Sequence, residues 1–256
     1  MNLSDPVSAY CERAGPGLLA EPLNALSNLA FLAAAWWLWS RLDARRPLLA
    51  GPQRVLAALI ALVGLGSFAF HTLATGWAGV LDVLFIGIFN LAFLVLYVRL
   101  LARRSWRWSA AAGVAFVTVD RLAARALPEE ALNGSLLYLP ALLVLGLLTA
   151  HALWRAPPAG RRMAAAAGVF LVSLLLRSID RAVCASWPWG THFLWHLLNA
   201  WVLFELSRAL LDGATDSGRG VDGPRGLAAV LDPAATEVLV QRDEVAQPLQ
   251  VDRDAR

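Results

Sequence analysis

Three of the four histidines stand near the ends of long apolar stretches, where their imidazole rings could bind a metal ion. His192 and His196 are four residues apart, so a helix would place both rings on one face, about 5–6 Å apart at Cβ. His71 ends another apolar stretch, with Ser67 four residues before it. Three neutral histidines leave one position for water on a tetrahedral zinc ion, which lowers the pKa of that water to about 7. The spacing therefore predicts a catalytic zinc site.

An aspartate strengthens this hypothesis. Asp82 begins a further apolar stretch, and an ionisable side chain at membrane depth is costly enough to indicate a function. Its carboxylate could orient the zinc water and accept its proton. The alternative is that the histidines only pack and form hydrogen bonds, but a third histidine and an aspartate at matching depth favour the metal site. His151 lacks such partners and is interpreted as interfacial, while Asp120 and Asp180 are interpreted as ion pairs with the arginines that follow them.

The composition indicates which elements must position these residues. Of the 256 residues, 58% are apolar and 16% are charged, whereas a soluble domain carries about 25% charged residues. Apolar segments that are long enough, or nearly so, to span a bilayer recur seven times, at about 23–40, 55–73, 80–98, 108–125, 135–153, 163–180 and 192–211. The sequence therefore predicts an all-α integral membrane bundle of seven transmembrane helices.

The bundle is predicted to occupy residues 23–212, after an exterior segment at 1–22 and before a mostly disordered cytoplasmic tail at 213–256. The chain has no lysine, and 12 of the 17 arginines before residue 212 lie in alternate connections. By the positive-inside rule, the N-terminus is outside and the C-terminus is cytoplasmic. The three histidines and Asp82 then lie toward the exterior.

Because the arginines sit in short loops between spans, a nucleic-acid partner is not expected. The arginine-only, alanine-rich composition is typical of GC-rich bacteria, which predicts the inner membrane with the site toward the periplasm.

The exterior segment holds a second polar group. Cys11 and Cys184 are the only cysteines, and their predicted location on one side of the membrane favours a disulfide over two free thiols. Side chains with oxygen atoms also lie near the N-terminal end of the first predicted helix. They are Glu12, Glu21, Asn24 and Asn28. These oxygens could cap the helix, which is the favoured interpretation, or bind a hard cation such as calcium.

Short motifs throughout the chain resemble the alkaline ceramidase family, within a wider superfamily of seven-helix membrane hydrolases that includes relatives of the adiponectin and progestin receptors. The resemblance covers residues 9–205. The motifs occur in the family's order and are YCER, EPLNALSN, GSFAFH, Leu81–Asp82, RSIDRAVC and HFLWH.

This resemblance implies a zinc-dependent amidase whose zinc ligands are His71, His192 and His196. Asp82 matches the acid that holds and deprotonates the zinc water, and Ser67 matches a residue that assists at the metal. The resemblance also implies the Cys11–Cys184 disulfide. It further implies a calcium site with Glu12, Glu21 and the backbone carbonyl of Tyr10 as ligands, although Ala9 and Ala14 stand where the family has two other ligands.

The expected function is hydrolysis of ceramide, or of a related N-acyl lipid, to a fatty acid and a long-chain amine such as sphingosine. The expected partners are the lipid substrate and the bilayer. A receptor or sensor with a structural zinc site is the alternative, since it would keep the histidines without needing a general base. A proton-relay transporter would need polar residues that continue toward the cytoplasmic leaflet, where the predicted helices are mostly apolar.

Overall fold

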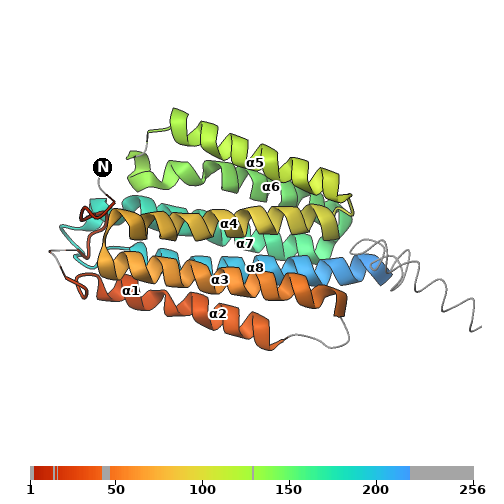
Figure 1. Cartoon of the computed structure of the whole chain (residues 1–256), viewed down its shortest axis with the longest axis horizontal. Coiled ribbons are helices and arrows are strands. Elements are labelled where there is room, and N and C mark those ends of the chain that lie inside the picture. The colour runs from red at the N-terminus through yellow and green to blue at the C-terminus, as the bar shows by residue number, and fades with distance from the viewer. Residues whose placement is uncertain (1–2, 14, 16, 42–46, 129, 220–256) are drawn as a thin grey trace, which may run out of the picture.

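The computed structural model describes residues 3–13, 15, 17–41, 47–128 and 130–219. Within these residues the chain is helical without a strand, and an isolated bridge pairs Pro6 with Thr75. Figure 1 shows long helices that lie side by side along one axis. In chain order the elements are α1 (Pro22–Ser27), α2 (Leu29–Ser40), α3 (Pro47–Leu73), α4 (Gly76–Leu100), α5 (Trp106–Ala126), η1 (Ala131–Tyr138), α6 (Leu139–Arg155), α7 (Pro157–Ile179), η2 (Asp180–Val183) and α8 (His192–Arg219).

All seven predicted apolar segments are helical, but several of their boundaries differ. The first segment is divided at Asn28 into α1 and α2, and α3 begins at Pro47 rather than near residue 55. Proline lacks a backbone N–H and suits the first turn of a helix, where that donor has no partner. At the other end of the chain, α8 continues to Arg219, so the first part of the predicted tail is helical. The rest of that tail, residues 220–256, lies outside the described residues.

Four of the described helical segments are long and apolar enough to cross a membrane. Their composition and length indicate a helical membrane protein. The helix α2 is too short to span alone, and α5 carries Arg107, Asp120 and Arg121. The four segments are Leu48–Leu73, Gly76–Leu100, Ala131–Arg155 and Pro157–Val183.

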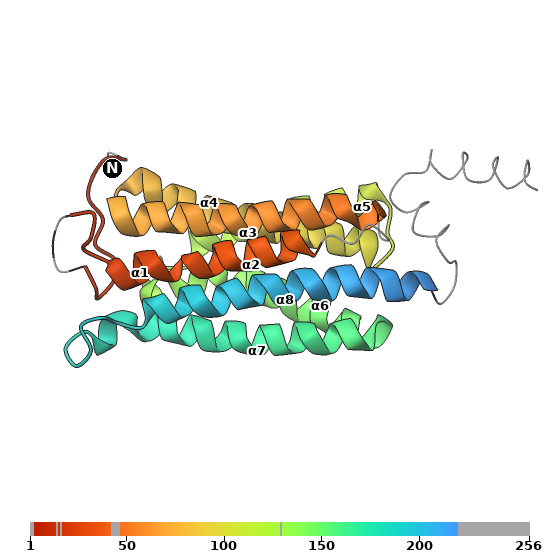
Figure 2. The same cartoon turned by 90° about the horizontal axis from the view of Figure 1, so that it is seen from below.

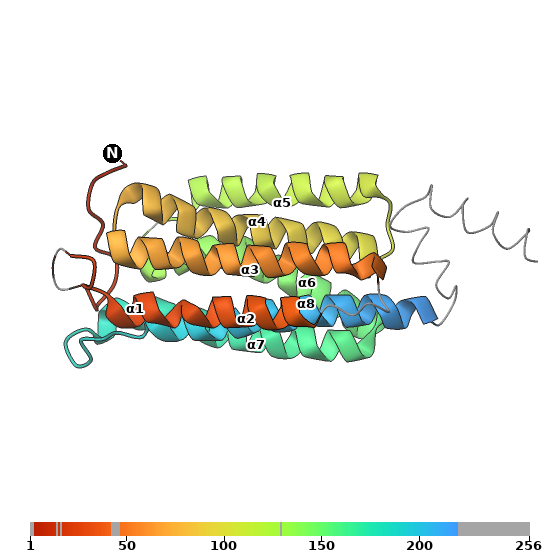
Figure 3. The ribbon, with the colours of Figure 1, turned by 60° about the horizontal axis from the view of Figure 1, so that its bottom comes forward.

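The helices pack mainly with their neighbours in the chain. The helix α3 lies between α2 and α4, while α7 lies between α6 and α8. The two groups meet where α8 packs against α2 and α3, which Figure 2 shows from below. The helix α5 packs mainly on α4 and is the outermost helix in Figure 3. Fully buried side chains such as Ile60, Met163 and Leu210 form the core between them.

One end of the bundle is covered by the N-terminal segment, residues 3–13, which crosses the turn between α3 and α4. The backbone N–H of Val7 donates to the carbonyl of Ala74 over 2.8 Å, and that of Trp77 donates to Leu3 over 2.9 Å. The loop between η2 and α8 lies at the same end (Figure 1). Three segments that are far apart in sequence therefore meet around the end of α3 and the start of α8.

Candidate metal centre

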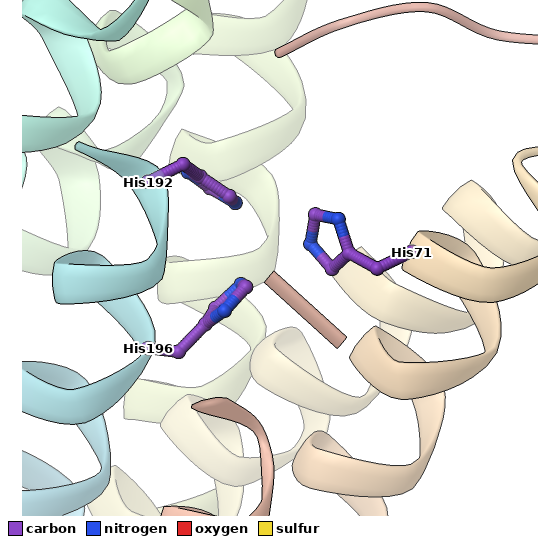
Figure 4. Close-up of side chains that lie close together, drawn as sticks. All are labelled: His71, His192 and His196. Atoms are coloured by element: carbon purple, nitrogen blue, oxygen red, sulfur yellow. The ribbon is translucent and has the colours of Figure 1, made fainter. Parts of the chain in front are cut away.

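Three histidines from two helices meet at this covered end. His71 lies in the last turn of α3, while His192 and His196 occupy one face of the first turns of α8. Their rings point toward a common space (Figure 4), and one ring nitrogen from each lies within 4.8 Å of the others. Nitrogens bound to one zinc ion at about 2.0–2.1 Å are at most about 4.2 Å apart. The observed spacing of up to 4.8 Å lies slightly above that limit, so a shared ion would draw the three rings closer together.

The burial of these rings also fits a metal ion. At most 1% of each histidine is exposed. Among the described residues, no hydrogen-bond partner is found for Nε2 of His71 or Nδ1 of His192. A buried polar atom without a partner is costly, and a bound cation would remove that cost. Three imidazoles suit zinc with one open position, and they also suit iron, nickel or copper.

Two of the histidines are held by hydrogen bonds at their outer nitrogens. Nδ1 of His71 lies 2.6 Å from Oε2 of Glu21, and Nδ1 of His196 lies 2.7 Å from Oγ of Ser27. Metal-binding histidines are commonly oriented in this way, because a partner at one nitrogen leaves the other free for the metal. Glu21 was expected to cap a helix or bind calcium, and Ser27 was not predicted at all.

The third histidine is held by an aromatic ring. The rings of His192 and Tyr10 are stacked, with centroids 3.5 Å apart and planes 14° from parallel. Tyr10 is buried in the N-terminal segment, and this burial raises the pKa of its hydroxyl. Its expected contribution was a backbone carbonyl to calcium, so its contact with His192 adds a role that the sequence did not indicate.

Ser67 and Asp82 lie beside the three histidines. Oγ of Ser67 is 3.4 Å from Nε2 of His196, and the carboxyl of Asp82 interacts with the Ser67 side chain. A close approach of α3 and α4 brings them together: a Cβ atom on Gly66 would lie 3.0 Å from the Leu81 carbonyl. The arrangement thus places a carboxyl and a hydroxyl next to the three histidine rings.

Arg177, in the last turn of α7, adds a positive charge beside the site. Its guanidinium lies 5.3 Å from the ring centroid of Tyr138 and 5.7 Å from that of Trp195. It also donates to the carbonyl of Asn133, and its charge interacts with Asp82. The rule that charges inside spans indicate function would have identified it.

Asp180 is another residue whose role the sequence did not reveal. Its carboxylate is fully buried and accepts backbone hydrogen bonds from Thr191 (2.6 Å), His192 (2.9 Å) and Cys11 (3.0 Å). The predicted ion pair with the following arginine is wrong, because the carboxylate binds these three amides instead. Asp180 therefore fixes the start of α8, which carries two of the three histidines.

The disulfide joins the same two segments. Cys11 and Cys184 are bonded, with their Cα atoms 5.3 Å apart. The bond ties the N-terminal segment to the loop before α8, as their predicted location on one side of the membrane indicated. Together with the hydrogen bonds to Asp180, the disulfide holds the N-terminal segment and the loop before α8 in place over the histidines.

The residues expected to bind calcium have other partners. Both oxygens of Glu12 accept backbone hydrogen bonds, from Leu23 over 2.6 Å and from Asn24 over 2.8 Å, so Glu12 caps α1. Burial raises the pKa of Glu12. Burial also opposes ionisation of Glu21, but hydrogen bonds from His71, Arg13 and Asn24 outweigh it and lower the pKa of Glu21. These contacts favour capping over calcium as the role of Glu12.

An apolar cavity lies within the bundle, and none of the three histidines lines it. Trp195 forms part of its wall, and the Trp195 ring is stacked 6.5 Å from the ring of His192. Phe89, Phe93 and Leu145 line it further along, and polar groups are few. Apolar and aromatic walls with few polar groups are typical of sites that hold small apolar ligands.

Comparison with models of known protein families and with curated proteins finds no match for this chain. The site combines three buried imidazoles, two of which have a ring nitrogen without a hydrogen-bond partner, with a neighbouring carboxyl and hydroxyl and a nearby apolar cavity. Such a set of groups can bind a metal ion, activate water and hold an acyl chain.

Proposed function

We propose that this chain is a zinc-dependent amidase that cleaves an N-acyl lipid within the membrane. The observation that carries the proposal is the buried His71–His192–His196 cluster, with Asp82 and Ser67 beside it, next to an apolar cavity. A structural metal site needs neither a general base nor an apolar cavity. Both features favour a hydrolase over a sensor.

The proposed chemistry assigns one task to each group. When bound, zinc would act as a Lewis acid toward the amide carbonyl and would make a water molecule more acidic. Asp82 would accept the proton of that water and later deliver it to the leaving amine. The Ser67 hydroxyl would donate a hydrogen bond to the oxygen that gains negative charge. The apolar cavity would hold the acyl chain.

The proposed substrate is ceramide or a related N-acyl lipid, with a fatty acid and a long-chain amine such as sphingosine as products. The motifs shared with alkaline ceramidases support this choice, and so does the apolar wall of the cavity.

We further propose that the chain crosses the membrane seven times, with the N-terminus outside. The pair α1–α2 would form one span and α5 and α8 two more, in addition to the four long apolar segments. Exposed tryptophans near both ends of the bundle support this arrangement, since tryptophan is enriched at membrane interfaces. They are Trp36, Trp39, Trp106, Trp108 and Trp154 near one end, and Trp77, Trp187 and Trp189 near the other. The arginine pattern then places the histidines toward the exterior, which is the periplasm if the membrane is a bacterial inner membrane.

The experiment is to measure fatty-acid release from a panel of N-acyl lipids, ceramides included, together with the metal content of the purified protein. We expect His196→Ala to lose both metal and release. His151→Ala is the matched control, because His151 lies at the opposite end of the bundle, where Nδ1 is 2.7 Å from the Tyr97 hydroxyl. Asp82→Asn should keep the metal and lose release. Retention of release in His196→Ala would overturn the proposal, and metal binding without release from any lipid would favour the sensor.

A further inference from the structure

Glu21 is a buried carboxylate that connects an arginine to a metal-site histidine. It is 2% exposed. Oε1 accepts a hydrogen bond from Nε of Arg13, and Oε2 accepts from Asn24 Nδ2 over 3.0 Å and lies 2.6 Å from Nδ1 of His71. Each carboxylate oxygen therefore has at least one close partner. The charge of Glu21 is balanced by Arg13 on one side and oriented toward His71 on the other.

Arg13 also contacts His71 directly. Its Nη2 donates to the backbone carbonyl of His71 over 3.0 Å, and its side chain is 7% exposed. The guanidinium thus contacts the end of α3 at the backbone and reaches the imidazole ring through Glu21. Because a guanidinium is always charged and presents a rigid fork of donors, it is a fixed cation at this position.

Few oxygen atoms near Arg13 and Glu21 remain available to bind a cation such as calcium. Both Glu12 oxygens are used by the backbone of α1, and the Tyr10 carbonyl accepts from the backbone N–H of Arg13 over 3.4 Å. In the group at the start of α1, the buried side-chain oxygens without a hydrogen-bond partner are Oδ1 of Asn24 and Oδ1 of Asn28. Two neutral oxygens fall short of the six to eight that calcium takes.

We propose that Arg13 takes the place of a divalent cation beside the metal centre, and that it acts as a positioning residue by holding Glu21 against His71. A calcium ion and a guanidinium can both balance a buried carboxylate, but only the guanidinium is part of the chain. The metal centre of this protein is therefore independent of calcium. The residues expected to hold calcium do not fit that ion, because Arg13 already supplies the positive charge.

The first test uses the unaltered protein in detergent. Its calcium content is measured after dialysis against calcium-free buffer, and its unfolding temperature is measured with and without millimolar calcium. We expect no bound calcium and no shift of the unfolding temperature. Bound calcium, or a higher unfolding temperature in its presence, would overturn the proposal. This test needs no substrate and no zinc measurement, so its outcome is separate from that of the proposed amidase.

The second test concerns positioning and rests on the metal centre of the proposed function. The zinc dissociation constant is measured by competition with a chelator. Loss of a residue that orients a metal ligand typically costs about 10–100-fold in affinity, and we expect that loss in Arg13→Gln. Arg13→Lys keeps the charge and should recover part of the affinity. Arg54→Ala is the matched control, because Arg54 lies on α3 near the end opposite His71. Zinc affinity that is unchanged in Arg13→Gln, or equally weak in both Arg13 variants, would contradict the positioning role.

Discussion

Nδ1 of His196 lies 2.7 Å from Oγ of Ser27, although 169 residues separate the two in the chain. The same hydroxyl donates to the backbone carbonyl of Asn24 over 2.9 Å, so its oxygen is left to accept the N–H of His196. This pairing fixes the imidazole tautomer in which Nε2 carries the free lone pair. The last residue of α1 thereby determines which nitrogen of His196 faces the cluster.

Replacement of Ser27 should therefore weaken the metal centre without removing a ligand. In Ser27→Ala we expect the zinc dissociation constant to rise about 10–100-fold, the usual cost of losing an outer partner. The measurement is chelator competition on the purified protein. Ser40→Ala is the control, because Ser40 is exposed at the far end of α2 and, within the described residues, donates to the Trp37 carbonyl of its own helix. Equal affinity in Ser27→Ala and the unaltered protein would show that the hydroxyl does not orient the ring.

The Cys11–Cys184 bond should contribute strongly to stability, because it closes a loop of 173 residues. Loss of a native disulfide typically costs about 2–5 kcal/mol. We expect Cys11→Ser to unfold at a lower temperature than the unaltered protein in detergent. A reductant should lower the unfolding temperature of the unaltered protein toward that of the variant and should leave the variant unchanged. An unaltered protein that is indifferent to the reductant would contradict this assignment.

The sequence carried enough information to predict the helices, the histidine cluster and the disulfide. Long apolar segments identify the helices, the spacing of His192 and His196 places them on one face, and the two cysteines fall on one predicted side. Each of these inferences uses a local pattern or a simple count of spans.

The contacts that hold the cluster could not be predicted in the same way. The bonds from Glu21 to His71 and from Ser27 to His196 join residues 50 and 169 positions apart. They depend on how the N-terminal segment folds back across the end of the bundle. Asp180 shows the same limit, since an acid next to an arginine looks like an ion pair in sequence, whereas its partners are backbone amides brought in from two other segments.

Gly190 should be intolerant of any side chain. Its φ is +64°, and a Cβ atom there would collide with Oδ1 of Asp180 and approach Cβ of Cys11 to 2.8 Å. Strain at such a position typically costs about 1–3 kcal/mol, so Gly190→Ala should lower the unfolding temperature. Gly146→Ala is the matched control, because no other described side chain lies within 4 Å of its Cβ position in α6. There the change should be neutral or stabilising, since alanine is the better helix former. Equal unfolding temperatures for the two variants would contradict the argument.

Gly66 should control how closely Asp82 approaches the cluster. A Cβ atom on Gly66 would lie 2.7 Å from the Phe85 ring and 3.0 Å from the Leu81 carbonyl, so α4 would have to move away from α3. Because Asp82 follows Leu81 and Ser67 follows Gly66, the movement would separate the proposed base from its hydroxyl partner. The three histidines lie on α3 and α8, so metal binding should be affected much less.

We therefore expect Gly66→Ala to keep its metal while its turnover of lipid falls. A displacement of about 1 Å can cost about 100-fold in rate, which sets the scale of the loss. Gly87→Ala is the control and should keep both properties, because in the described part of the chain no side chain lies within 4 Å of its Cβ position on α4. Metal content and fatty-acid release are measured on the same preparations. If metal content and release fell together in Gly66→Ala, the close approach at Gly66 would support the whole centre rather than the position of Asp82. A loss of release alone would tie turnover to the separation of Asp82 from Ser67.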